Sequence, residues 1–202
     1  MAKVDEAWNY ISDINAKSKV QYLIRDQNRR DLTLSTTVPH LKGTMVWMGI
    51  STNGVTKPRF VQPGAKINSE YYIQKILKPF LKDDYCRLYA NGDAVFHQDS
   101  TPSHASRVTQ KFLTDQQMQF LKPQQWMPNS PDATTPCDYF LWGLLKNKLN
   151  RRRVSTLRCL QKAIREEMKK IPQEMILRAL KSWPKCCRQI YYAEDRHIEK
   201  HR

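Results

Sequence analysis

Long apolar runs and glycine are scarce in this chain of 202 residues. The longest stretch without Asp, Glu, Lys or Arg is Gly43–Thr56, 14 residues, whereas a membrane helix needs about 20 apolar residues. The first residues contain no apolar segment typical of a signal peptide, so we expect an intracellular protein without a membrane span. With only 6 Gly and 40% hydrophobic residues, the composition excludes global disorder and can supply a sizeable core.

Cysteines are few and show no spacing typical of a metal or disulfide framework. There are five of them, an odd number: Cys86, Cys137, Cys159, Cys186 and Cys187. No C-x-x-C motif and no paired Cys/His spacing occurs, so neither a zinc site nor a disulfide framework is supported. Reduced thiols are expected.

Acidic residues are in deficit. The chain has 34 Lys and Arg against 19 Asp and Glu, a formal net charge of +15. The excess is steepest between Lys146 and Lys170, where ten basic residues face only Glu166 and Glu167. Such a balance favours polyanionic partners.

The first hundred residues are predicted to form mainly strands. β-Branched and aromatic residues favour strands at Val20–Ile24, Met45–Ser51 and Val55–Val61, and the Thr52-Asn53-Gly54 turn joins the last two as a hairpin. A buried strand ending in a carboxylate is expected at Ala94–Asp99.

Helical spacing of apolar residues predicts helices around and after these strands. One is expected to begin at Asn68 or Ser69, with a kink at Pro79, and another at Thr101-Pro102. Three more are expected from Thr135, from Leu157, and from Pro172 until Pro184 interrupts it. The order predicts one domain over residues 1–202, a hairpin-led sheet flanked by helices with its core at about 1–150 and a basic helical region at about 151–202.

Three carboxylates stand out by context: Asp5 in a β-like segment, Asp99 at a strand end and Asp138 at a helix start. Carboxylates from distant segments can bind divalent ions for phosphoryl transfer. Taken alone, each aspartate is better explained as a helix cap or turn residue. Asp93 and Asp132 compete as candidates, but both are better explained as turn residues.

The sequence around the three aspartates resembles the catalytic domain of the mariner superfamily of DNA transposases. Val4-Asp5-Glu6-Ala7-Trp8 is similar to the family's first-aspartate box. The strongest match is Phe96-His97-Gln98-Asp99-Ser100-Thr101-Pro102-Ser103-His104, in which Ser100 replaces the usual Asn. Pro136-Cys137-Asp138-Tyr139-Phe140-Leu141-Trp142 resembles the third motif, whose carboxylate opens a helix.

The resemblance implies an RNase H-like α/β fold with a mixed sheet flanked by helices. It also implies that Asp5, Asp99 and Asp138 are catalytic ligands of two Mg²⁺ ions, with Mn²⁺ as a substitute, and that the partner is DNA in the nucleus. Family members act as dimers, so a homodimer is one expectation, whereas a membrane or a small organic cofactor is not expected.

Two departures from the family pattern affect these expectations. Asp99 and Asp138 have 38 residues between them, a longer spacing than in the best-known members, and a loop can absorb the difference. Only four residues precede Asp5, so a truncated first strand with weak pairing is expected, and no helix-turn-helix module fits ahead of it. A catalytically inactive, nucleic-acid-binding remnant and a non-specific nuclease are therefore kept as alternatives.

Several other residues have both a functional and a packing interpretation. The basic residues Lys146, Lys148, Arg151, Arg152 and Arg153 are predicted to contact DNA phosphates, with a solvated helix end as the alternative. His97 and His104 flank the second motif and are expected to be packing residues. Trp47, Trp126 and Trp142 are expected to pack in the core rather than to stack on bases.

Overall fold

The computed structural model describes residues 2–11, 43–89, 92, 94–125 and 135–192. The strands are β1 (Ala2–Tyr10), β2 (Gly43–Ser51), β3 (Gly54–Val55), β4 (Arg59–Phe60), β5 (Val95–His97) and β6 (Gln119–Phe120). The helical elements are α1 (Ser69–Tyr71), η2 (Tyr72–Leu77), α2 (Lys78–Phe80), η3 (Leu81–Tyr85), α3 (Cys86–Leu88), α4 (Pro102–Ala105), α5 (Arg107–Asp115), η4 (Pro123–Gln125), η5 (Cys137–Trp142), α6 (Gly143–Asn150), α7 (Leu157–Lys169) and α8 (Gln173–Tyr192). The strand expected at Val20–Ile24 lies outside the described residues.

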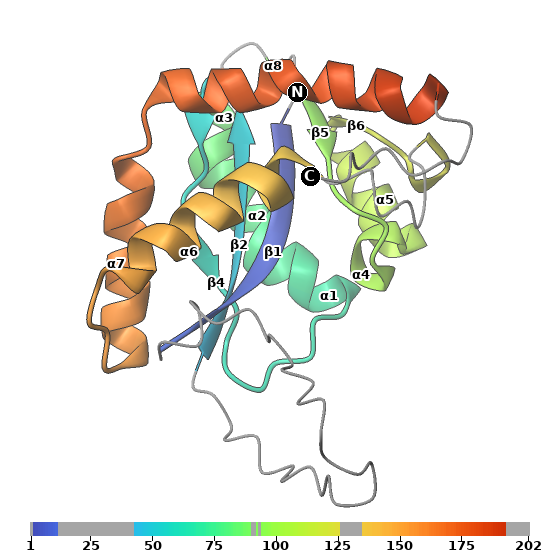
Figure 1. The fold of residues 1–202 in the computed structure, drawn as a ribbon. Helices are drawn as coiled ribbons and strands as arrows, with labels where there is room; N and C mark the ends of the chain where they lie inside the picture. The colour runs from blue at the N-terminus through green and yellow to red at the C-terminus, as the bar shows by residue number, and fades with distance from the viewer. Residues whose placement is uncertain (1, 12–42, 90–91, 93, 126–134, 193–202) are drawn as a thin grey trace, which may run out of the picture.

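A mixed sheet forms the centre of the fold (Figure 1). Its strand order is β3-β2-β1-β5-β6, and β4 also pairs with β2. β1 runs antiparallel to β2 along all nine of its residues and parallel to β5. The expectation of a weakly paired first strand is therefore wrong, because β1 lies between two partners in the middle of the sheet.

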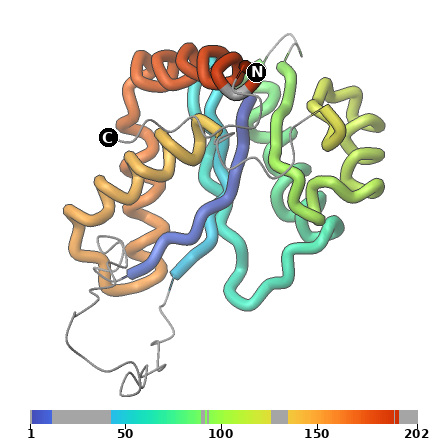
Figure 2. Tube along the Cα trace, turned by 45° about the vertical axis from the view of Figure 1, so that its right-hand side comes forward, coloured from blue at the N-terminus to red at the C-terminus, as the bar shows by residue number. Residues whose placement is uncertain are grey.

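Each face of the sheet carries its own apolar core. Residues of β2 alternate between the faces, as the period of two in a strand requires. Val46 and Met48 pack against η5, α6 and α7, whereas Trp47 packs on the opposite face against η2, α2 and α5. Figure 2 shows the elements after residue 135 on one side of the strands and the helices between residues 69 and 115 on the other.

The predicted hairpin is confirmed at its turn and differs in its second strand. β2 and β3 pair antiparallel around the turn, and Gly54 adopts a φ of 130° that only glycine accepts readily. The expected strand Val55–Val61 is divided into β3 and β4, with Pro58 between them. Proline has no N–H to give to a ladder, so it interrupts the pairing with β2.

Several helix boundaries follow the predicted capping chemistry. The Asn68 side chain accepts a hydrogen bond from the Tyr71 N–H, which caps α1 as expected. The helix predicted from Thr101-Pro102 is two helices, because Ser106 has an extended backbone and caps α5 anew. Pro79 lies between two π-helical segments, η2 and η3, an irregularity that accommodates its missing N–H.

The last helix contradicts one expectation. α8 does not stop at Pro184 but continues to Tyr192. Pro184 is exposed, so solvent can satisfy the carbonyl group that loses its helical partner. No helix among the described residues is both long and apolar enough to cross a bilayer.

Candidate functional site

Asp5 lies in the middle of β1 and faces the helical segment that carries Asp138. The indole Nε1–H of Trp142 donates to Asp5 Oδ2 over 2.7 Å. Trp142 is buried in the core between β2 and α6, so the donor is fixed by packing. Trp142 therefore orients one oxygen of Asp5.

Asp138 is the second residue of η5 and is anchored by Thr135, two residues before this helical segment. Its Oδ2 accepts hydrogen bonds from the Thr135 backbone N–H at 2.9 Å and from the Thr135 hydroxyl at 3.0 Å. This interaction uses one carboxylate oxygen of Asp138, whose side chain is exposed.

Asp5 and Asp138 are hydrogen-bonded to each other through their side chains. Burial, followed by the hydrogen bond and charge of Asp138, raises the pKa of Asp5 to about 8. The neighbouring carboxyl group of Asp138 therefore disfavours the ionised form of Asp5. The structure thus brings together two of the three predicted ligands.

Asp99 lies two residues after the end of β5, and its side chain is bound by His104. Its Oδ1 accepts hydrogen bonds from the Thr101 N–H at 3.2 Å and from His104 Nδ1 at 2.6 Å. The second ring nitrogen of His104, Nε2, lies 3.1 Å from Glu6 Oε1.

In this second cluster one histidine lies between two acidic side chains, Asp99 and Glu6. Burial alone would raise the pKa of Asp99, but the hydrogen bond and charge of His104 outweigh it and lower the pKa. Burial likewise opposes a charged His104, yet its bonds to Asp99 and Glu6 raise its pKa to about 9. His104 is therefore an imidazolium between two carboxylates.

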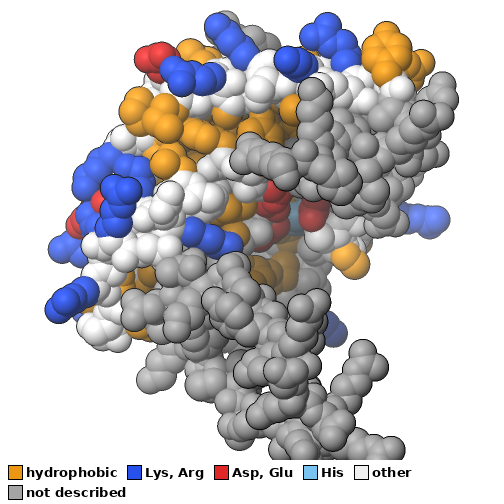
Figure 3. Space-filling model, viewed as in Figure 1, with side chains coloured by type: hydrophobic (Ala, Val, Ile, Leu, Met, Phe, Trp, Pro, Cys, Tyr) orange, Lys and Arg blue, Asp and Glu red, His pale blue; other side chains and the backbone are white. Residues whose placement is uncertain are grey.

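The strand register relates the two clusters. Lys3 pairs with His97 across the parallel strands β1 and β5, so Asp5 and Asp99 each follow two residues later in the same direction. Neighbouring strands lie about 4.8 Å apart. Figure 3 shows acidic side chains and a histidine gathered in a recess at the centre of this face. Nevertheless, no three His, Cys, Asp or Glu side chains of the described residues converge as a ready-made metal site.

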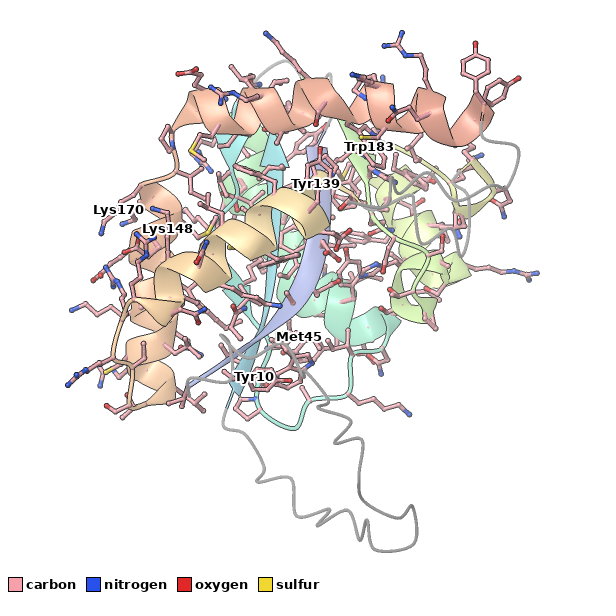
Figure 4. All side chains as sticks on the ribbon, in the orientation of Figure 1. Tyr10, Met45, Tyr139, Lys148, Lys170 and Trp183 are labelled. Atoms are coloured by element: carbon pink, nitrogen blue, oxygen red, sulfur yellow. The ribbon has the colours of Figure 1, made fainter. Side chains whose placement is uncertain are left out.

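Of the five residues predicted to bind phosphates, two form ion pairs with glutamates of α7. Arg152 binds Glu166 at 2.7 Å and Glu167 at 2.5 Å, and Lys148 lies 3.6 Å from Glu167. These ion pairs tie α6 to α7, as Figure 4 shows for Lys148 beside α7. Arg151 and Arg153 are exposed, and Lys146 is half-buried.

The tryptophans and histidines with two interpretations from the sequence differ in their surroundings. Trp47 and Trp142 are buried, as core packing predicts, and Trp126 lies outside the described residues, as does Asp132. His97 is buried with its Nδ1 2.7 Å from Lys3 Nζ. His104 was expected to be a packing residue, but it contacts a predicted ligand directly. Sequence reasoning also missed the contacts of Glu6, Trp142 and Thr135.

No protein-family model and no curated protein matches the chain. Solved structures do match. The Mos1 transposase paired-end complex with left transposon end superposes with a TM-score of 0.75 and 21% identity, over 98% of this chain and 56% of that one. The crystal structure of the catalytic domain of Mos1 mariner transposase gives a TM-score of 0.71 and 16% identity, over 98% of this chain and 83% of that one. The chain has the fold of a mariner transposase catalytic domain.

This likeness confirms the RNase H-like α/β class expected from the sequence. The chain spans 56% of the length of Mos1 transposase in the paired-end complex. A structure of the Mos1 catalytic domain with raltegravir and Mg matches as well, with a TM-score of 0.71 and 18% identity, over 98% of this chain and 85% of that one.

Proposed function

We propose that this chain is a DNA transposase catalytic domain that cleaves and joins DNA strands with divalent metal ions held by Asp5, Asp99 and Asp138. The observation that carries the proposal is the contact between the Asp5 and Asp138 side chains, on the strand that lies next to the one leading to Asp99. The Mos1 fold and the Mos1 structures with Mg and with Mn support it.

The donor set fits a hard divalent cation. Among the described residues, each aspartate has one oxygen held by a protein donor: Oδ2 of Asp5 by Trp142, Oδ2 of Asp138 by Thr135, and Oδ1 of Asp99 by His104. Oxygen-only donors are those that Mg²⁺ and Mn²⁺ prefer.

The side chains have separable tasks in this proposal. Asp5, whose pKa is raised, must be deprotonated before it can act as a ligand beside Asp138. Trp142 and Thr135 keep the two carboxylates oriented while that happens. When bound, the metal ions polarise the phosphodiester and activate the attacking water or 3′-hydroxyl.

Mn²⁺ binding tests the site without knowledge of the DNA substrate. We expect saturable Mn²⁺ binding by the purified chain, measured by electron paramagnetic resonance, and its loss in Asp138→Ala. Asp115→Ala is the matched control, because Asp115 is an exposed carboxylate of α5 that forms an ion pair with Lys111. A folded wild-type chain that binds no Mn²⁺, alone or with DNA, would favour the inactive nucleic-acid-binding alternative.

Product analysis separates a transposase from a nuclease. A transposase joins a 3′-hydroxyl end to target DNA, whereas a nuclease only releases cut strands. Radiolabelled DNA ends incubated with a plasmid should therefore become covalently linked to it. Cleavage without any joined product would support the nuclease alternative.

The DNA-contact part of the proposal rests on the exposed residues of the basic segment. Arg151→Ala with Arg153→Ala should weaken DNA binding and reduce the slope of log affinity against log salt by about 2, since each neutralised phosphate contributes about one. Lys111→Ala is the control, because Lys111 lies on α5 outside this segment. An unchanged slope would contradict the assignment of these two arginines.

A further inference from the structure

His104 occupies a fixed position between the two segments that carry Asp5 and Asp99. Its side chain is 2% exposed, and its two ring nitrogens reach Asp99 at 2.6 Å and Glu6 at 3.1 Å. Both partner atoms are carboxylate oxygens, which accept hydrogen bonds, so both nitrogens donate. His104 thereby joins β1 to the segment after β5.

The imidazole ring has little freedom to turn. The Tyr72 ring lies on it with centroids 4.2 Å apart. The Tyr72 hydroxyl donates to Gln98 Oε1 at 2.8 Å, and Gln98 Nε2 donates to the His104 carbonyl at 3.4 Å. Stacking and backbone anchoring therefore keep Nδ1 directed at Asp99.

The contact selects between the two oxygens of Asp99. His104 Nδ1 and the Thr101 N–H both donate to Oδ1 of Asp99, and the Thr101 side chain also hydrogen-bonds this carboxylate. We propose that His104 is a positioning residue that holds Asp99 with Oδ2 presented to the metal, while Glu6 holds the imidazole from behind. This inference rests on the proposed metal-dependent function.

A pair of amide substitutions separates positioning from packing. In His104→Asn the side-chain amide nitrogen replaces Nδ1 and can still donate to Asp99, whereas in His104→Gln it replaces Nε2 and reaches Glu6 instead. We expect His104→Gln to lower Mn²⁺ affinity by about 10- to 100-fold and His104→Asn to stay within about threefold of wild type. Thermal unfolding of both variants is measured alongside.

The outcome depends on which variant retains affinity. Rescue by His104→Asn together with loss in His104→Gln supports the inference, because lost packing would weaken both variants. Equal affinities in both variants and in wild type would overturn it. If wild type binds no Mn²⁺, the proposed function fails instead, so the two failures are distinguishable.

Glu6→Ala provides an independent measurement if His104→Gln does not fold. It removes the second anchor of the imidazole without touching Asp99, and we expect a loss of Mn²⁺ affinity of about tenfold. An unchanged affinity would overturn the role given to Glu6. Complete loss, equal to that of Asp99→Ala, would make Glu6 a metal ligand and would also overturn the inference.

Discussion

Asp5 and Glu6 are neighbours on β1, yet their carboxyl groups lie in opposite electrostatic environments. Side chains of successive strand residues point to opposite faces. Asp5 meets a second carboxyl group, Asp138, and its pKa rises to about 8. Glu6 meets His104, which is shared with Asp99 and whose own pKa rises to about 9. Glu6 thus has a positively charged partner, His104, whereas Asp5 has a second acidic partner, Asp138. A divalent cation would compensate the charge of the Asp5–Asp138 pair.

The largest expected effect comes from replacing Asp99, the proposed metal ligand that His104 binds. Asp99→Asn should reduce DNA cleavage at least about 1,000-fold, because a neutral amide is a poor metal ligand. DNA affinity should change little, because Asp99 carries no positive charge for phosphates. Cleavage gels and DNA-binding isotherms measure the two effects, and Asp115→Asn serves as control. A parallel collapse of binding and cleavage would indicate a damaged fold.

A smaller effect is expected when the hydrogen-bond donor to Asp5 is removed. Trp142→Phe keeps most of the buried bulk and removes the Nε1–H donor at Asp5 Oδ2. We expect Mn²⁺ affinity to fall about tenfold, as for other partners that orient metal ligands. Calorimetric titration of Mn²⁺ at one pH would measure it. Unaltered affinity would leave Trp142 with a packing role alone.

The smallest expected effect is on the pH dependence of folding stability, and its sign follows from the raised pKa of Asp5. A carboxyl whose folded pKa is raised stabilises the protein at low pH, and that stability is lost as pH rises from about 4 towards about 8. Asp5→Asn does not titrate, so it should stabilise the metal-free chain relative to wild type more at pH 8 than at pH 5.

Urea unfolding in the presence of a chelator, at pH 5 and at pH 8, tests this prediction. The same variant should lose Mn²⁺ binding, so stability and ligation change in opposite directions. A stability difference that is the same at both pH values would show that the Asp5–Asp138 pair does not titrate in this window.

Local chemistry made much of the fold predictable. The Asn68 cap and the turn before Gly54 depend on residues a few positions apart, and the sequence indicates both. The three aspartates were found through motifs that resemble a family. The contacts of Glu6 with His104 and of Trp142 with Asp5 could not be predicted, because they depend on strand register and helix docking between segments separated by 98 and 137 residues.

The central position of β1 has a consequence for synthesis on the ribosome. Its antiparallel partner β2 ends at Ser51, but its parallel partner β5 begins only at Val95. A nascent chain that ends before β5 therefore exposes one edge of β1, and exposed edges pair readily with other chains. We therefore expect pausing of translation between these two strands to favour aggregation.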